Sequence, residues 1–419
     1  MCSRRRGYRT PCRRAPEAWE LEPGRGAGIT VGHPDTGYTN HPELEPGALD
    51  LSRAWDVLDN DPDAHDPLVD RVWWPLDSPG HGTATGSVIA GRPSGEIQGA
   101  APGVKLVPLR TIKSVVQVFD GDVAVAIERA RQAGCEIVSM SLGGVGFAGA
   151  VRDAIRTAVE SGMIVMAAAG NEVGFVTAPA SWPECLAIGG ISITDAPWPG
   201  SSHGPQVDLC APAEAVWAAT ARRDHGRAVF TVEPHDGTSF AVANTAGVAA
   251  LWLAYHDADA LRRRYGRDNL QRLFLTLARQ AARRPDGWDA RNYGAGILDA
   301  RALLETELPD ATAFARPAAR AAAPPPQPLD RLATLWPELT TAQVRSALGR
   351  RLGKRGAELD ALLERFGGEL FYQYSQDAEL RHDLAEPPAG APGARRSQAA
   401  APHTLHRTAS RALREALSK

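Results

Sequence analysis

Hydrophobic positions in the central part of the chain alternate between two spacings. Between residues 28 and 300, short β-branched and apolar runs are separated by stretches in which apolar residues recur at helical spacing. The strand-like runs are 29–31, 104–109, 136–140 and 163–168, and the helical stretches include 120–133, 150–160 and 269–284. This alternation predicts an α/β fold in which right-handed crossovers join the strands of a mostly parallel sheet.

One segment is apolar on every face. Small and apolar residues fill 242–251, directly after the sequence Gly-Thr-Ser-Phe-Ala at 237–241. The pattern predicts a buried helix that begins beside Ser239. A serine in this position is more often an N-cap than a nucleophile, but the backbone N–H groups and the dipole of a helix N-terminus also favour developing negative charge.

The composition divides the chain into five parts. Residues 1–18 are basic and predict a disordered leader, whereas 19–307 carry the α/β pattern of the main domain. An Ala/Pro-rich linker at 308–328 follows, then a small helical unit at 329–385 with renewed helical periodicity, and a disordered Pro/Ala/Arg tail at 386–419. The helical unit either docks on the main domain or recruits a partner, whose identity is unknown.

Composition also narrows the function classes. The chain is 43% hydrophobic with a net charge of −3, which argues against nucleic acid and anionic membranes as partners. No run approaches the roughly 18 apolar residues of a membrane span, and the basic leader lacks the apolar region of a secretory signal.

The five cysteines are scattered and predict neither a zinc site nor a disulfide framework. Cys135, Cys185 and Cys210 lie in or beside apolar runs and are interpreted as buried thiols. Together with the missing signal, these thiols favour the cytoplasm over secretion but leave the compartment open.

Candidate chemistry lies at the ends of the predicted strands and the starts of the predicted helices. Asp35 belongs to an Asp-Thr-Gly sequence and His81 to a His-Gly-Thr sequence, and both precede Ser239. Asp, His, Ser is one of the chain orders used by the catalytic triads of serine hydrolases. Ligand clefts of open α/β sheets form at this edge, so topology and chemistry agree.

These motifs resemble those of the subtilase family of serine endopeptidases. The sequence Ala-Ala-Ala-Gly-Asn at 167–171 adds a fourth similarity, in which Asn171 resembles the oxyanion-hole residue. The resemblance covers most of the first 300 residues and implies a subtilisin-like three-layer fold. It further implies an endopeptidase that acts on polypeptides, requires no cofactor, and uses Ser239 as nucleophile, His81 as base and Asp35 as the group that orients His81.

By the same resemblance, two segments bind substrate. Ser141, Leu142 and Gly143 form the edge with which an extended peptide pairs. Ala168, Ala169 and Gly170 line the pocket for the residue before the cleaved bond, the P1 residue, and their small size implies a roomy, apolar pocket.

Some features depart from the family pattern. Phe240 stands where the family usually has methionine, and the proline and histidine usual after it are missing, which affects helix packing rather than the triad. Only 34 residues precede Asp35, fewer than a usual pro-segment needs. A catalytically weak scaffold that binds proteins is therefore an alternative, and an esterase or amidase with the same triad is another.

Two further features are kept as hypotheses. Asp59, Asp61 and Asp63 crowd one loop and are candidate ligands of a structural Ca²⁺ ion, although the loop is not an EF-hand and a solvated acidic loop is the competing interpretation. His33 lies two residues before Asp35, lacks the His-Gly-Thr context, and is interpreted as a hydrogen-bonded histidine.

Overall fold

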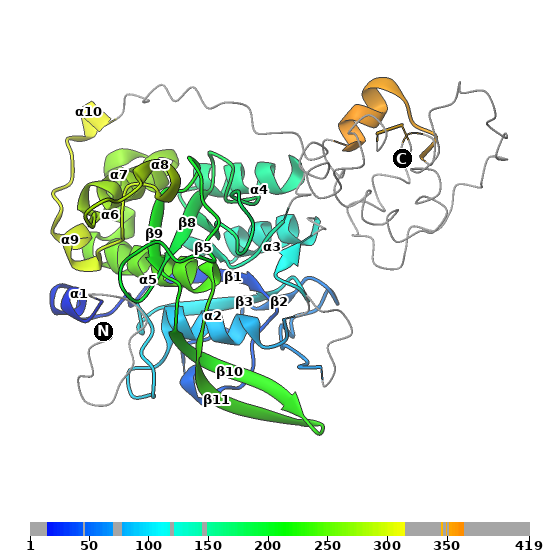
Figure 1. Cartoon of the computed structure of the whole chain (residues 1–419), viewed down its shortest axis with the longest axis horizontal. Coiled ribbons are helices and arrows are strands. Elements are labelled where there is room, and N and C mark those ends of the chain that lie inside the picture. Colours follow the sequence, from blue (N-terminus) through cyan, green and yellow to red (C-terminus); the bar gives the residue numbers. More distant parts are fainter. Residues whose placement is uncertain are drawn as a thin grey trace.

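The computed structural model describes residues 15–44, 47–69, 78–117, 121–144 and 149–314, together with 345–346, 349 and 352–363 (Figure 1). The linker beyond residue 314, the tail at 386–419 and most of the unit at 329–385 therefore lie outside the described residues. Within that unit, residues 356–363 are helical.

A parallel sheet forms the centre of the described domain, as the alternating pattern predicts. Among the described residues its order is β2-β3-β1-β5-β7-β8-β9, and every neighbouring pair is parallel. The strands are β1 (Thr30–Asp35), β2 (Trp55–Asp56), β3 (Lys105–Arg110), β5 (Ile137–Met140), β7 (Ile164–Ala168), β8 (Leu186–Ile191) and β9 (Leu209–Pro212).

Helices cover both faces of this sheet. On one face lie α3 (Gly121–Gln132) and α4 (Gly149–Glu160), and on the other lie α1 (Ala15–Leu21), α2 (His81–Ala90), α5 (Thr238–His256), α6 (Ala258–Tyr265), α7 (Leu270–Ala281) and α9 (Ala300–Glu305). Each face of the sheet packs against its helices in a separate hydrophobic core, and successive strand residues point into the two cores alternately. Ile164 belongs to one core and Val165 to the other. The fold is the three-layer α/β arrangement expected from the sequence.

The helix α5 lies inside the molecule. Every residue from Thr238 to Leu253 is buried, and Trp252 packs edge-on against Phe274 of α7 with ring centroids 5.5 Å apart. This burial confirms the helix predicted from the run that is apolar on every face.

The structure contains a long antiparallel hairpin that the sequence pattern did not predict. It consists of β10 (Val216–Asp224) and β11 (Arg227–His235) and extends past α2, away from the sheet (Figure 1). The N–H of Ala219 donates to Ser87 Oγ of α2 at 2.9 Å, which ties the hairpin to that helix. The remaining elements are short: β4 (Val116–Gln117), β6 (Gly143–Gly144), η1 (Pro42–Leu44), η2 (Arg267–Asn269), α8 (Ala290–Tyr293) and α10 (Ala311–Phe314).

Both predicted borders of the main domain need correction. Helix α1 begins at Ala15, and Ala15 and Ala18 are fully buried, so residues 15–18 belong to the domain rather than to the leader. At the other end, the Tyr265 hydroxyl donates to the Pro309 carbonyl at 2.6 Å and the Phe314 ring meets Tyr265 edge-on. Alanine-rich composition resembles a linker here, but this aromatic contact anchors residues 308–314 to the domain.

The three cysteines of the described domain, Cys135, Cys185 and Cys210, are free and buried, as predicted. Burial raises the pKa of Cys135 to about 12. None of the described helices is both long and apolar enough to cross a membrane.

Candidate active site

Asp35 is the last residue of β1 and is fully buried. The strand pairs with β3 along its whole length but with β5 only at Val31 and Gly32, because Pro34 has no N–H to donate to a second ladder. The carboxyl end of β1 is thus held from one side only. Its other side is left for the side chains that surround the Asp35 carboxylate.

His81 is the first residue of α2, and its Nδ1 lies 2.8 Å from Asp35 Oδ1. The next residue makes this approach possible. A Cβ on Gly82 would lie 2.2 Å from the Gly37 carbonyl oxygen and 3.2 Å from Asp35 Cβ, so a residue with a side chain would push α2 away from β1. The Gly82 N–H also donates to Thr36 Oγ1 at 3.0 Å.

The surroundings of Asp35 favour its ionised form. Burial alone would raise the pKa of this carboxyl group, but the electrostatic interaction and hydrogen bond with His81, the electrostatic interaction with His33 and the Thr36 N–H together lower the pKa below its ordinary value. The Thr36 N–H donates to Asp35 Oδ1 at 2.7 Å. Because an ionised carboxylate only accepts hydrogen bonds, His81 Nδ1 carries the proton that it shares with Asp35.

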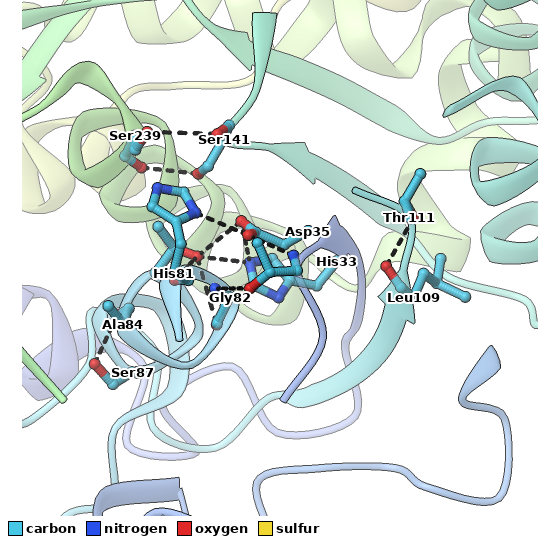
Figure 2. Close-up of polar contacts among 12 residues, drawn as sticks. His33, Asp35, His81, Gly82, Ala84, Ser87, Leu109, Thr111, Ser141 and Ser239 are labelled. Carbon is cyan, nitrogen blue, oxygen red and sulfur yellow. Dashed lines mark hydrogen bonds and ion pairs between the residues drawn. The ribbon is translucent and has the colours of Figure 1, made fainter. Parts of the chain in front are cut away.

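Ser239 is the second residue of α5, and only 7% of it is exposed. Its hydroxyl donates to the Ser141 carbonyl oxygen at 3.4 Å, and the Ser141 hydroxyl donates back to the Ser239 carbonyl oxygen at 3.0 Å. Figure 2 shows the His81 ring between Asp35 and Ser239. A strand end and two helix starts therefore bring the three predicted triad residues together.

Asn171 follows β7 and lies beside the start of α5. Its Oδ1 accepts from the Thr238 backbone N–H at 2.9 Å and from the Thr238 hydroxyl at 2.8 Å. These two donors fix the orientation of the amide and leave Nδ2 as its donor. Nδ2 lies 3.4 Å from the position of a Cβ on Gly237, two residues before Ser239.

The two predicted substrate segments differ in their surroundings. Ser141 meets Ser239, but Leu142 is only 2% exposed and packs into the core. Gly143 pairs with β4 and donates its N–H to the Val115 carbonyl at 3.1 Å. In the second segment, Ala168 and Ala169 are buried and Gly170 is partly exposed.

Thr177, which the sequence motifs do not mark, lies between these segments. Its Oγ1 is 2.5 Å from the position of a Cβ on Gly143 and 3.1 Å from that of a Cβ on Gly170. The hydroxyl donates to the Ala169 carbonyl at 3.2 Å. Thr177 therefore fills space that the small residues alone would leave open.

Phe240 packs beside the predicted triad. It is 4% exposed, and its ring lies 6.4 Å from that of His81 and stacks on His235 at 5.4 Å between centroids. The burial agrees with the apolar role expected of this residue.

The three candidate calcium ligands have protein partners. Asp59 Oδ2 accepts from Arg110 at 2.7 Å, Asp61 Oδ1 from the Asp63 N–H at 2.8 Å, and Asp63 Oδ1 from the His65 N–H at 3.2 Å. Across the described ranges, no group of three or more His, Cys, Asp or Glu side chains is arranged to hold a metal ion. Calcium binding stays a prediction.

Three threonines that were not predicted as site residues support the site. Thr36, Thr85 and Thr238 each hydrogen-bond a predicted site residue or its neighbour. Thr85 follows His81 by four residues, and this spacing places two side chains on one face of a helix. That spacing was the available signal for Thr85.

Comparisons with known proteins find similar sequences and a similar fold. A family model described as the Subtilase family matches residues 26–296. Mycosin-1 of Mycobacterium tuberculosis is 29% identical over 394 residues, which cover 78% of this chain and 81% of mycosin-1. Thermitase of Thermoactinomyces vulgaris is 30% identical over 241 residues, which cover 57% of this chain and 78% of thermitase. The crystal structure of MycP1 with the N-terminal propeptide removed is similar with a TM-score of 0.52 and 26% identity, over 71% of this chain and 96% of that one.

Proposed function

The chain belongs to the subtilase family and is a serine-type endopeptidase, and from this premise we propose that Ser239, His81 and Asp35 are its catalytic triad. The observation that carries the proposal is the 2.8 Å contact between His81 Nδ1 and Asp35 Oδ1, with Ser239 on the other side of the ring. Asn171 is the proposed oxyanion donor.

The first step forms a tetrahedral intermediate. The Ser239 hydroxyl turns from the Ser141 carbonyl towards His81 and attacks the carbonyl carbon of the peptide bond, while His81 Nε2 takes its proton. Because Nδ1–H is bound to Asp35, Nε2 is the nitrogen free to accept this proton. Asp35 stabilises the resulting imidazolium and stays ionised.

Asn171 acts on the charge that develops in this step. Its Nδ2 donates to the oxyanion together with the backbone N–H of Ser239, which lies in the first turn of α5 and has no acceptor within the helix. The Thr238 donors hold the Asn171 amide in place before substrate binds. A donor fixed in advance needs no reorganisation during the reaction.

The remaining steps restore the enzyme. His81 passes its proton to the nitrogen of the departing amine as the carbon–nitrogen bond breaks, and the acyl group stays on the Ser239 oxygen as an acyl-enzyme. A water molecule then attacks the acyl-enzyme and gives its proton to His81. When the ester bond breaks, this proton returns to the Ser239 oxygen and the new carboxylic acid leaves.

The substrate proposed is a polypeptide in extended conformation. Ser141 and Leu142 offer backbone groups beside Ser239, and Leu142 contributes only its backbone because its side chain is buried. The N–H of Gly143 is already bonded to the Val115 carbonyl. Backbone recognition suits an enzyme that cleaves within polypeptide chains.

Matched substrates test this function. We expect the protein to hydrolyse extended peptide amides, and the variant Ser239→Ala to lose this activity while melting at the same temperature as the wild type. Turnover of short esters without any turnover of peptides would instead indicate an esterase. Peptide hydrolysis that persists in the Ser239→Ala variant would contradict the assignment of Ser239 as the nucleophile.

A further inference from the structure

A buried polar chain lies behind the triad, on the side of Asp35 away from Ser239. His33 of β1 is 3% exposed, and its Nε2 lies 3.0 Å from Thr85 Oγ1 of α2. Thr85 is fully buried and its Oγ1 lies 3.1 Å from Asp35 Oδ2, the oxygen that His81 does not use. Figure 2 shows His33 next to Asp35 within this group.

The Thr85 hydroxyl has one proton and three oxygen acceptors within reach. Besides Asp35 Oδ2, these are the carbonyl oxygens of His81 at 3.1 Å and Gly82 at 3.5 Å. The charged carboxylate is the strongest of the three acceptors. Since an ionised carboxylate cannot donate, the contact with Asp35 is a hydrogen bond only if Thr85 gives its proton to it.

This use of the proton decides the tautomer of His33. When Thr85 donates to Asp35, its contact with His33 is one that it accepts, so His33 carries its proton on Nε2. The opposite tautomer would take the Thr85 proton and leave Asp35 Oδ2 without this donor. Burial lowers the pKa of His33, as does the charge of His81, and the opposing charge of Asp35 does not reverse this, so the ring is neutral and has one proton to place.

We propose that His33 and Thr85 are a positioning pair that holds the Asp35 carboxylate from behind and acts through it on His81. Neither side chain touches the reacting atoms. Thr85 binds Asp35 Oδ2 while His81 and the Thr36 N–H bind Oδ1, which fixes the plane of the carboxylate. His33 keeps the Thr85 hydroxyl turned towards Asp35. The kinetic part of this inference rests on the proposed triad.

The pair has a predictable effect on the titration of His81. A hydrogen bond to Asp35 Oδ2 draws negative charge from the carboxylate, so its loss makes Asp35 a stronger partner for the His81 imidazolium and raises the pKa of His81. Asp35 and His81 are the titratable groups that face His33, and His235 of β11 faces His81 from the other side. Arg110 of β3 is bound to Asp56 and Asp59 instead.

The test is an NMR titration of the imidazole nitrogens of His81 in full-length Ser239→Ala protein, which cannot digest itself. In this background Thr85→Val removes the hydroxyl and keeps the shape, and we expect the pKa of His81 to rise. Thr85→Ser restores the hydroxyl and should restore the titration. Thr245→Val is the matched control, because Thr245 is equally buried and its hydroxyl bonds only to the Ala241 carbonyl of its own helix at 2.9 Å. An unchanged titration in Thr85→Val, or an equal shift in Thr245→Val, would overturn the proposal.

Kinetics with an intact Ser239 give the second readout. Thr85→Val should lower kcat roughly tenfold with little change in KM, the lower end of what one hydrogen bond to a charged group contributes. The acidic limb of kcat/KM should move to higher pH. His33 Nε2 lies 3.7 Å from Asp35 Oδ2, beyond hydrogen-bond distance, so a neutral His33 orients the carboxylate through Thr85. His33→Leu combined with Thr85→Val should therefore lose no more than Thr85→Val alone, and additive losses would contradict this order. If the triad itself were wrong, the failure would appear in Ser239→Ala, whereas the NMR titration would still report on the pair.

Discussion

At the scale of single residues, Asn171 combines two contacts that substitution can separate. Its Oδ1 holds Thr238 and its Nδ2 is the proposed oxyanion donor. We expect Asn171→Ala to lower kcat by roughly 10²–10³, a magnitude taken over from a subtilisin, with little change in KM because the bond forms in the transition state. Thr238→Val, which keeps the backbone contact and Nδ2, should lose much less. Steady-state kinetics measure both variants, and equal losses of kcat would indicate that Asn171 has a structural role rather than a role in binding the oxyanion.

Thr177 allows a test of a different property, the size of the proposed P1 pocket. Its hydroxyl lies close to Gly143 and Gly170, so the pocket is smaller than the small residues at 168–170 imply. Thr177→Gly should raise kcat/KM for peptides with a large P1 residue relative to alanine at P1. Thr177→Ser, which keeps the hydroxyl, should keep the wild-type order of preference. A series of peptides that differ only at P1 measures this, and an unchanged order in Thr177→Gly would contradict it.

At the scale of elements, the hairpin and α2 are fitted to each other at Gly80. This residue has φ +81° and precedes His81, and a Cβ on it would lie 2.2 Å from the Ala221 carbonyl oxygen of β10. Gly226 at the hairpin tip has φ +78° with open space around it, so it is a matched control. Both changes to alanine carry a left-handed strain of about 1 kcal/mol. Only Gly80→Ala should also lower kcat/KM, because α2 must shift; equal activity and equal melting temperatures in the two variants would refute this coupling.

The same elements show what the hydrophobic pattern predicts and what it does not. Strands β5 and β7 are buried on both faces and appear as almost continuous apolar runs, and the run of small and apolar residues in α5 is equally clear. The hairpin cannot be predicted in this way, because β10 contains three alanines and ends in Arg222-Arg223-Asp224. This sequence lacks the alternation of a half-buried strand. Its turn depends on His225 and Gly226, both with positive φ.

The candidate site shows the same division. Asp35, His81, Asn171 and Ser239 stand in short motifs whose residue types the chemistry requires, so sequence suffices to find them. Thr177 and His33 carry no such motif. Their contacts with Gly143 and Thr85 join residues 34 and 52 positions apart, and only the fold brings these pairs together.

At the scale of the whole molecule, the buried Asp35 links stability to pH. Its pKa is lowered in the folded state, so ionised Asp35 contributes stability above its unfolded pKa of about 3.9, and this contribution is lost as the pH falls through the lower folded value. In the Ser239→Ala background, Asp35→Asn should therefore cost most free energy of unfolding above about pH 5 and progressively less below about pH 4. Urea unfolding across this range measures the difference, and a difference independent of pH would contradict the assignment of the low pKa.

The central claim is that the three distant motifs form one working nucleophilic centre, and a fluorophosphonate probe tests it most directly. The probe reacts with a serine hydroxyl only where a base and an oxyanion site are assembled around it. Intact mass and peptide mapping should show one label, on Ser239 in α5, and none in Ser239→Ala or His81→Ala. A folded wild-type protein that takes up no label, or a label on another serine, would contradict the account.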